Sequence, residues 1–306
     1  MDRRRFLNLA AATSATTALG TLPRPGFAAS HELLKRTIPS SGKTVPILGM
    51  GTWITFNVGK NERLRGKRLE VLKAFFAAGG GMIDSSPMYG SSEEVVGYCL
   101  AKLPSQKNLF TATKVWTVSK WMGVRQMETS QQLWGHKTFD LMQTHTLVDW
   151  EVHVETLNAW KSDGRLKHTG IMTSHGRRHE DFERIARTHT FDFAQFTYNI
   201  EDREAENRLL PMAADRGMGV IINRPFQRGA LIKKLQSKPL PPWASEVGAR
   251  SWPQFLLKFV ISHPAVTCAI PATSNPAHMI ENMEAGRGLL PDPQQRERMA
   301  AYVQSL

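Results

Sequence analysis

The feature of this sequence that most restricts its fold is a regular alternation of short apolar runs and segments with helical spacing. Eight apolar runs, each followed by a helical segment, occupy the chain from residue 45 onward. Such alternation is typical of a parallel sheet covered by helices. Eight units in about 250 residues favour a closed (β/α)8 TIM barrel over an open doubly wound sheet. The expected strands are 45–48, 82–83, 109–113, 139–144, 167–172, 193–197, 219–223 and 266–270, and the expected helices are 66–78, 91–103, 120–133, 151–162, 180–187, 201–215, 252–262 and 276–285.

The pattern predicts one α/β domain that spans residues 31–306. No complete Gly-x-Gly-x-x-Gly turn follows the first apolar run, which disfavours a Rossmann fold. The polar segment 31–44 is expected to form a short hairpin that closes the bottom of the barrel. The longest irregular stretch, residues 224–250, follows the seventh expected strand, at the face where barrels keep their active sites. A loop of this length is expected to be functional or disordered.

Residues 1–30 have the layout of an export signal. Arginines 3–5 precede Phe6-Leu7, and an uncharged stretch follows up to Pro23. This resembles the signal peptide of the twin-arginine type, which is read on proteins that fold before export. We therefore expect the protein to use the twin-arginine export machinery, with cleavage after Ala28 or Ser30, and to be periplasmic or otherwise exported. The alternative is an amphipathic N-terminal helix, which the lack of a charged face disfavours.

Composition restricts the partners. The net charge is +12, and without residues 1–30 there remain 35 Lys and Arg against 26 Asp and Glu, a net charge of +9. No basic stripe with interleaved aromatic residues is present, so we expect no nucleic-acid partner and a bias toward anionic ligands. No uncharged apolar run of about 18 residues follows the signal, so no stable membrane insertion is expected after cleavage. Cys99 and Cys268 lack metal-ligand spacing, and no metal site is predicted.

Four chemically active side chains follow consecutive expected strands. Asp84 and Tyr89 follow the second strand, Lys114 the third and His145 the fourth. Side chains at these ends converge on one mouth in a barrel. A neighbouring ammonium lowers the pKa of a phenol, Asp84 can balance that ammonium, and His145 can orient a carbonyl oxygen. Each residue alone could be structural: a turn cap, a packed aromatic, an exposed lysine or a core histidine. Their joint placement favours proton delivery to a carbonyl that receives hydride.

These segments resemble the aldo-keto reductase family. The run from Met82 to Glu93, with Asp84 and Tyr89 five apart before Gly90, is similar to the family signature. Residues 111–114 resemble its lysine strand, 139–145 its histidine strand and 49–53 its first strand, and the likeness runs in order from about residue 45 to 285. The resemblance implies that Tyr89 is the general acid, that Lys114 and Asp84 tune it, and that His145 orients the substrate.

The resemblance also implies a nicotinamide cofactor, with NADP(H) favoured and NAD(H) as the alternative. Gln195 matches the residue that holds the carboxamide, and Tyr198 falls near the residue that stacks on the ring. The family usually has Ser-Asn where Met172-Thr173 stands, and often Lys or Arg where Ala272 and His278 stand. The implied cofactor-binding residues are Gly51, Thr52, Trp53, Asp84, Thr173, Ser174, Gln195, Tyr198, Pro225, Thr273, Ser274, Asn275, His278, Glu281 and Asn282.

The substrate is expected to be a small carbonyl compound or alcohol bound by Trp53, Tyr89, Trp116 and His145. Phe56, Met88 and Trp150 also follow expected strand ends and are expected to line the mouth. Two other functions stay open: a Schiff-base lyase with Lys114 as nucleophile, and a catalytically silent exported barrel that binds a ligand. Because free cofactor is expected to be scarce outside the inner membrane, we also expect an exported enzyme to carry its cofactor across in the folded state.

Overall fold

A computed structural model describes residues 32–306. The expected export signal, residues 1–30, lies outside the described residues. In the described range no helix is long and apolar enough to cross a membrane. The strands are β1 Lys35–Thr37, β2 Thr44–Pro46, β3 Met50–Gly51, β4 Met82–Asp84, β5 Phe110–Val115, β6 Phe139–His145, β7 Leu166–Met172, β8 Phe193–Thr197, β9 Gly219–Asn223 and β10 Cys268–Ala269. The α-helices are α1 Glu62–Ala77, α2 Ser92–Leu100, α3 Lys120–Trp134, α4 Trp150–Ser162, α5 His179–Thr188, α6 Leu209–Asp215, α7 Ala230–Leu235, α8 Trp252–Ile261, α9 Pro276–Glu284 and α10 Pro293–Gln304.

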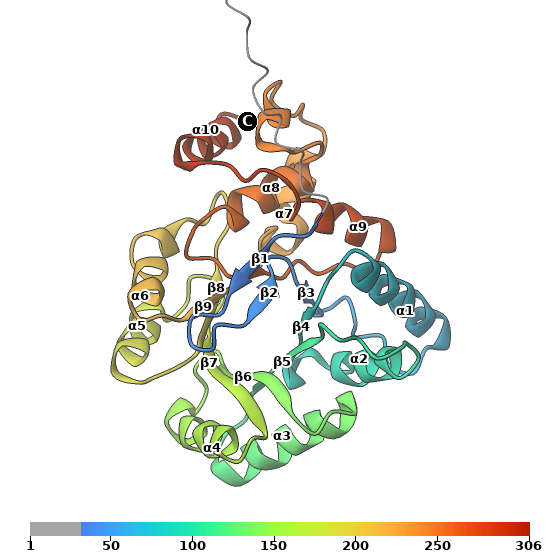
Figure 1. The fold of residues 1–306 in the computed structure, drawn as a ribbon, viewed down its shortest axis with the longest axis vertical. Helices are drawn as coiled ribbons and strands as arrows, with labels where there is room; N and C mark the ends of the chain where they lie inside the picture. Colours follow the sequence, from blue (N-terminus) through green and yellow to red (C-terminus); the bar gives the residue numbers. More distant parts are fainter. Residues whose placement is uncertain (1–31) are drawn as a thin grey trace, which may run out of the picture.

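The eight strands β3 to β10 form a parallel barrel, as the alternation predicts. They pair in chain order, and the helices form a ring around them (Figure 1). Backbone hydrogen bonds from Gly49 to Ala269 and from Gly51 to Pro271 close the circle between β3 and β10. A Cβ at Gly51 would lie 2.8 Å from the carbonyl oxygen of Ile270, so the closure needs glycine at this position.

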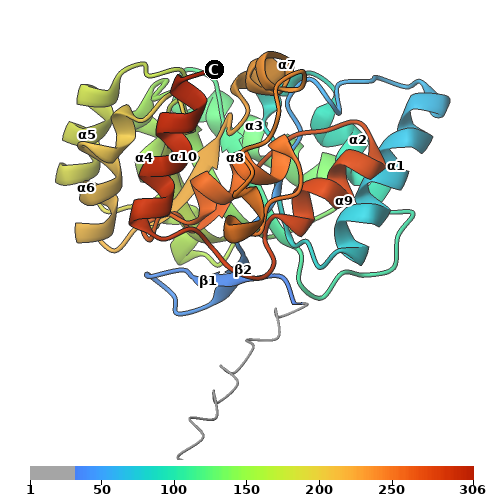
Figure 2. The same ribbon diagram turned by 90° about the horizontal axis from the view of Figure 1, so that it is seen from above.

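The predicted hairpin is β1 and β2, which lie below the barrel at the end opposite α7 (Figure 2). Ile38 and Val45 of this hairpin belong to an apolar cluster that fills the barrel interior together with side chains of β4, β5, β6, β8, β9 and β10. Only the second half of the expected strand 45–48 reaches the barrel, because 45 and 46 pair within the hairpin, Leu48 bridges Ala269 of β10, and the strand itself is Met50–Gly51. An apolar run of four residues can pack in either place, since both positions are buried.

Two segments differ from the expected helices. The expected helix 201–215 is divided into a 3-10 turn at Glu204–Glu206 and α6. The stretch 224–250 contains α7 and the 3-10 turns Gln227–Gly229 and Ala244–Val247, so much of it is ordered.

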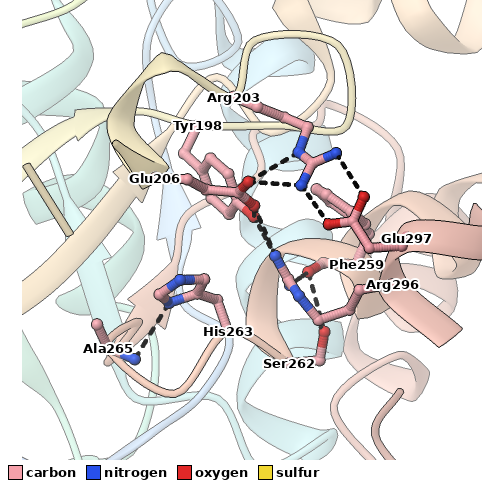
Figure 3. Close-up of polar contacts among 9 residues, drawn as sticks. All are labelled: Tyr198, Arg203, Glu206, Phe259, Ser262, His263, Ala265, Arg296 and Glu297. Atoms are coloured by element: carbon pink, nitrogen blue, oxygen red, sulfur yellow. Dashed lines mark hydrogen bonds and ion pairs between the residues drawn. The ribbon is translucent and has the colours of Figure 1, made fainter. Parts of the chain in front are cut away.

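Helix α10 was not expected, and a polar network attaches it to the barrel (Figure 3). The Arg296 guanidinium on α10 donates to the backbone oxygen of Phe259, to the Tyr198 hydroxyl and to Glu206. Tyr198 in turn donates to Glu206. A buried guanidinium is tolerated when its donors are satisfied, so this network adds to the apolar contacts that Met299, Ala300 and Val303 of α10 make in the core.

Backbone strain concentrates at one end of the barrel. All ten non-glycine residues with positive φ in the described range lie in loops that follow β3, β5, β6, β7 or β9. Each such residue costs free energy that the surrounding structure must offset, and such residues cluster at functional sites. The strain therefore points to the carboxyl-terminal face of the sheet, where TIM barrels keep their active sites.

Candidate active site

Three adjacent strand ends bring the four predicted catalytic side chains together. Asp84 ends β4, Tyr89 lies in the 3-10 turn Pro87–Tyr89 just after it, and Lys114 and His145 lie on β5 and β6. The Lys114 Nζ lies 2.6 Å from Asp84 Oδ2 and 5.4 Å from the centre of the Tyr89 ring. The rings of Tyr89 and His145 meet edge to face, with centres 5.7 Å apart. The structure thus assembles the predicted cluster.

Lys114 and Asp84 form a buried ion pair. The lysine also donates to the backbone oxygen of Ser85 at 2.8 Å, and Asp84 accepts from the side-chain amides of Gln195 at 3.2 Å and Gln143 at 3.4 Å. Burial lowers the pKa of Lys114 and raises that of Asp84, and the contact between the two charges opposes both shifts. The amides and the Ser85 carbonyl supply the extra hydrogen bonds that a buried ion pair requires.

Tyr89 is partly buried, and its pKa moves in the direction opposite to the one expected. Burial raises the pKa of the Tyr89 phenol well above 10, and the negative charge of Asp84 raises it further. The net shift of the Tyr89 pKa is therefore opposite to the expected one, because burial and Asp84 outweigh the Lys114 ammonium, which is bound to Asp84 and Ser85. The phenol is therefore protonated at neutral pH, which is the state that a proton donor requires.

One hydroxyl positions both Tyr89 and His145. The fully buried Ser86 Oγ caps the turn that carries Tyr89 by accepting from the backbone N–H of Met88, and it lies 2.7 Å from Nδ1 of His145. Burial and the charge of Lys114 lower the pKa of His145 well below 6.5, so the ring is neutral. Since Ser86 already accepts from Met88, its own hydrogen is free to be donated to Nδ1. When Ser86 donates in this way, the imidazole hydrogen lies on Nε2, where it can be donated to a carbonyl oxygen.

The predicted cofactor residues occupy the other part of the mouth. Gly51 ends β3, and Thr52 and Trp53 follow it; Thr173 and Ser174 follow β7; Gln195 lies on β8; Pro225 follows β9; Thr273, Ser274 and Asn275 follow β10; and His278, Glu281 and Asn282 lie on α9. They come from β7 to β10 and from β3, which are neighbours around the closed barrel. The predicted catalytic residues therefore lie on and after β4 to β6, and most of the predicted cofactor residues lie on and after the remaining strands, which we call the predicted cofactor arc.

Buried polar atoms without a hydrogen-bond partner test whether a nicotinamide fits beside the tetrad of Asp84, Tyr89, Lys114 and His145. The amide oxygens of Gln143 and Gln195 are buried beside Asp84 and have no hydrogen-bond partner in the described part of the chain. A carboxamide has an NH₂ group that can donate to such acceptors. The residues present therefore fit the group. Thr173, in contrast, donates its hydroxyl to the backbone oxygen of Arg177, and its own carbonyl accepts from Asn223.

The structure corrects the prediction that Tyr198 binds the cofactor. It directly follows β8, but its side chain is fully buried among the helices, where its hydroxyl contacts Arg296 and Glu206 and its ring packs beside Phe259 of α8 (Figure 3). It does not lie with the tetrad and is not placed to stack on a ligand in the mouth.

The turn after β10 has the form of a helix start. Asn275 caps α9 by accepting from the backbone N–H of Ala277, Pro276 is the first helical residue, and Thr273 accepts from the backbone of Asn275. Ser274 and His278 are exposed, whereas Asn282 is buried. The backbone of Ser274 also accepts from Arg68 of α1 at 3.4 Å. A capped helix start of this kind is a favourable place for an anionic group.

The rest of the mouth is apolar on one side. Six of the nine large hydrophobic side chains that are exposed in the described range follow β3, β4 or β5: Ile54, Met88, Trp116, Val118, Trp121 and Met122. Trp116 is 42% exposed, and its ring centre lies 6.4 Å from that of His145. Phe56 and Trp150 are buried, so the expectation that they line the mouth is wrong.

Sequence reasoning missed Ser86, Gln143 and Arg224. Ser86 precedes proline and has the pattern of a turn cap, which gave no signal for its contact with His145. Gln143 lies two residues before His145 on the same strand, so period-two alternation could have placed it on the same face. Arg224 directly follows β9, where side chains reach the mouth, but the prediction treated residues 224–250 as one irregular stretch and singled out only Pro225.

Three comparisons with known proteins agree with this geometry. The Aldo/keto reductase family profile matches residues 47–301. The chain is 26% identical over 219 residues to aldo-keto reductase YhdN of Bacillus subtilis, covering 65% of this chain and 64% of that protein. It is 27% identical over 228 residues to an NADH-specific methylglyoxal reductase of Escherichia coli, covering 61% and 66%. The matched part thus spans just under two thirds of these relatives' lengths.

A solved structure shares the fold. The aldo/keto reductase of Klebsiella pneumoniae, solved in complex with NADP and acetate, superimposes with a TM-score of 0.72 at 22% identity, covering 87% of this chain and 94% of that one. The family profile covers most of the described residues, including every strand of the barrel and the whole tetrad. The chain belongs to the aldo/keto reductase family.

Proposed function

We propose that this protein is an NAD(P)H-dependent oxidoreductase that reduces an aldehyde or ketone to an alcohol, or catalyses the reverse. The observation that carries the proposal is the convergence of Asp84, Tyr89, Lys114 and His145 at one barrel mouth. These side chains supply an acid, a buried cation and a neutral hydrogen-bond donor within one small site. That set matches the needs of a carbonyl oxygen that gains negative charge.

Each residue has a role that follows from its contacts. His145 Nε2–H donates to the carbonyl oxygen and fixes its direction, and Tyr89 gives its proton to the same oxygen. The Lys114 ammonium stabilises the phenolate that remains, and Asp84 keeps that ammonium in place at 2.6 Å. The bound nicotinamide would supply hydride to the carbonyl carbon. Gln195 and Gln143, with free amide oxygens, would hold its carboxamide.

The identity of the cofactor is a separate proposal. We favour NADP(H), with NAD(H) as the alternative. The Klebsiella structure was solved with NADP, whereas the Escherichia coli relative is named as NADH-specific. Relatives of both kinds therefore occur at similar distances from this chain.

The apolar side of the mouth bears on the substrate. Met88 and Trp116 lie next to Tyr89 and His145 and are about two-fifths exposed. Apolar walls of this kind favour carbonyl compounds with hydrophobic substituents. A Schiff-base role for Lys114 is disfavoured, because its Nζ is fully buried and bound to Asp84 and to Ser85. A silent barrel is disfavoured because all four positions keep groups that can act.

Location is also part of the proposal. We propose that residues 1–30 direct the folded protein through the twin-arginine machinery to the periplasm, with its cofactor bound. The motif at residues 3–7 supports this. Replacing Arg4 and Arg5 with lysine should retain the protein in the cytoplasm, as measured by cell fractionation. Denaturing the exported protein should release nicotinamide cofactor. If several preparations released none, the proposal that the protein crosses the membrane with its cofactor bound would be contradicted.

An absorbance assay of nicotinamide oxidation tests the activity. The purified protein is mixed with NADPH or NADH and a panel of aldehydes and ketones, and alcohol formation is followed in parallel. Turnover of at least one carbonyl class, lost in Lys114→Met, is the expected result. Cofactor binding by calorimetry without turnover of any carbonyl would favour the ligand-binding alternative.

A further inference from the structure

Glu93 is a buried carboxylate in the signature segment to which the proposed mechanism assigns no role. It lies in the first turn of α2, four residues after Tyr89, and only 1% of it is exposed. The preceding Ser92 donates its hydroxyl to the backbone oxygen of Tyr89 at 2.9 Å, which attaches the start of this helix to the turn that carries the proposed acid. Burying a carboxylate is costly unless other groups compensate its charge, so the position of Glu93 needs an explanation.

Three hydrogen bonds reach the Glu93 carboxylate from two other elements. Oε1 accepts from the Thr113 hydroxyl at 2.6 Å and from the Trp134 indole N–H at 3.1 Å, and Oε2 accepts from the Ser130 hydroxyl at 3.0 Å. Thr113 lies on β5, whereas Ser130 and Trp134 lie on α3, which is next to α2 in the ring of helices (Figure 1). An indole N–H can only donate, and both hydroxyls can donate at the same time. Three donors on one carboxyl group stabilise its ionised form.

The negative charge of Glu93 acts on Lys114 through the wall of the barrel. Thr113 and Lys114 are consecutive residues of β5, so their side chains point to opposite faces of the sheet. Thr113 therefore reaches Glu93 among the helices, and Lys114 reaches Asp84 on the other side. Burial lowers the pKa of Lys114, and the charges of Asp84 and Glu93 both oppose that shift. Burial raises the pKa of Glu93, and its three hydrogen bonds and the charge of Lys114 oppose that shift in turn.

The groups around the Lys114 ammonium show why a second counter-charge matters. Asp84 on β4 binds it directly at 2.6 Å. His145 on β6 is neutral, since burial and the charge of Lys114 lower its pKa. Tyr89 faces the ammonium with its ring at 5.4 Å and becomes negative only after it has given up its proton. Before the reaction, Asp84 and Glu93 are therefore the two negative charges in the described part of the chain that keep the proton on Lys114.

We infer that Glu93 is a positioning residue for the proposed reaction and that it acts through Lys114. Its carboxylate is the second counter-charge of the ammonium and keeps it charged beside Tyr89, while its hydrogen bond with Thr113 fixes the strand that carries Lys114. The consequence for catalysis rests on the proposed function, because it requires Lys114 to stabilise the Tyr89 phenolate. The electrostatic coupling of Glu93 and Lys114 does not rest on it and can be measured without turnover.

The test compares Glu93→Gln with the control Glu94→Gln in the full protein. Glutamine keeps the length of the side chain and an oxygen that can accept from Trp134, but it carries no charge. Glu94 is the next residue of α2 and forms an ion pair with Arg65 of α1. A third variant, Glu93→Asp, keeps the charge on a shorter side chain. Urea denaturation first confirms that the variants fold.

Two readouts follow the charge of Lys114. The first is a ¹³C NMR pH titration of lysine Cε, in which Lys114→Met identifies the resonance, and the second is the alkaline limb of kcat/KM for an aldehyde that the wild-type protein reduces. In Glu93→Gln both midpoints should lie about 1 pH unit below the wild-type values, because an ammonium that loses a counter-charge releases its proton more readily. Glu93→Asp should shift them less than Glu93→Gln does, and Glu94→Gln should leave them close to the wild-type values.

A reciprocal measurement covers the case that Glu93→Gln does not fold. Coupling between two sites is mutual, so Lys114→Met should raise the pH at which the Glu93 carboxyl loses its proton, as followed by ¹³C NMR of glutamate Cδ. The inference is overturned if Lys114 has the same NMR midpoint in Glu93→Gln and Glu94→Gln, or if the Glu93 titration is unchanged in Lys114→Met. A shifted NMR midpoint with an unmoved alkaline limb would overturn the role in catalysis. A shifted midpoint in a protein that reduces no aldehyde would support the coupling and contradict the proposed function.

Discussion

Replacing Ser86 with alanine removes the one hydroxyl that links Tyr89 to His145. The hydroxyl lies 2.7 Å from His145 Nδ1, and both residues are buried, with exposures of 0% and 2%. Leaving a buried acceptor unpaired costs about 1–3 kcal/mol. Without the serine donor, the imidazole hydrogen can move to Nδ1, and Nε2 then no longer donates to the substrate. If that cost is expressed fully in the transition state, kcat/KM falls about 5- to 150-fold.

The control for this prediction is Ser85→Ala. Ser85 is the neighbouring buried serine, and its hydroxyl accepts from Thr52 at 2.9 Å rather than contacting His145. The assay is steady-state reduction of one aldehyde, together with ¹⁵N chemical shifts of the His145 ring. Ser86→Ala should lower kcat/KM more than Ser85→Ala does and should change the tautomer reported by the shifts. Equal kcat/KM in the two variants, with an unchanged tautomer, would refute the reasoning.

Three further predictions concern the buried charges and the correction at Tyr198. Lys114→Met should abolish turnover and lower the free energy of unfolding by about 3–5 kcal/mol, because the Asp84 carboxylate stays buried without its partner; urea denaturation should show recovery of most of that loss in the double variant with Asp84→Asn. Tyr198→Phe should cost about 1–2 kcal/mol of stability through its lost hydrogen bonds and leave dinucleotide affinity unchanged, as measured by calorimetry. Because the pKa of Tyr89 is raised above 10 and that of His145 is lowered, kcat/KM for reduction should stay level through the neutral range and fall only in alkaline solution, as Lys114, whose pKa burial lowers, and then Tyr89 lose their protons; a fall within the neutral range would contradict these assignments.

The tetrad could be predicted from the sequence because barrel geometry converts position into proximity. Asp84, Lys114 and His145 end or nearly end adjacent parallel strands, and parallel strands in register carry such residues to one mouth. Residue identity then supplied the chemistry. No tertiary contact had to be known in advance, apart from the order of the strands.

The predictions that failed, and the contacts that were not predicted, depend on residues far apart in the sequence. Tyr198 follows a strand as the others do, but its side chain points toward the helices because Arg296, 98 residues later, supplies a partner for its hydroxyl. The contact between Ser86 and His145 joins residues 59 apart, and no local pattern signals it. The direction of the Tyr89 pKa shift likewise depends on where the Lys114 ammonium points, which the order of residues does not determine.

The most direct test of the proposed mechanism is Tyr89→Phe. This change removes the phenolic hydroxyl and keeps the ring that packs against His145. Dinucleotide affinity is measured by calorimetry and the chemical step by single-turnover reduction of an aldehyde that the wild-type protein reduces. Loss of a general acid slows the step by about 10²- to 10⁴-fold, and the account predicts a loss in this range with dinucleotide affinity unchanged. A single-turnover rate equal to that of the wild-type protein would show that Tyr89 is not the acid.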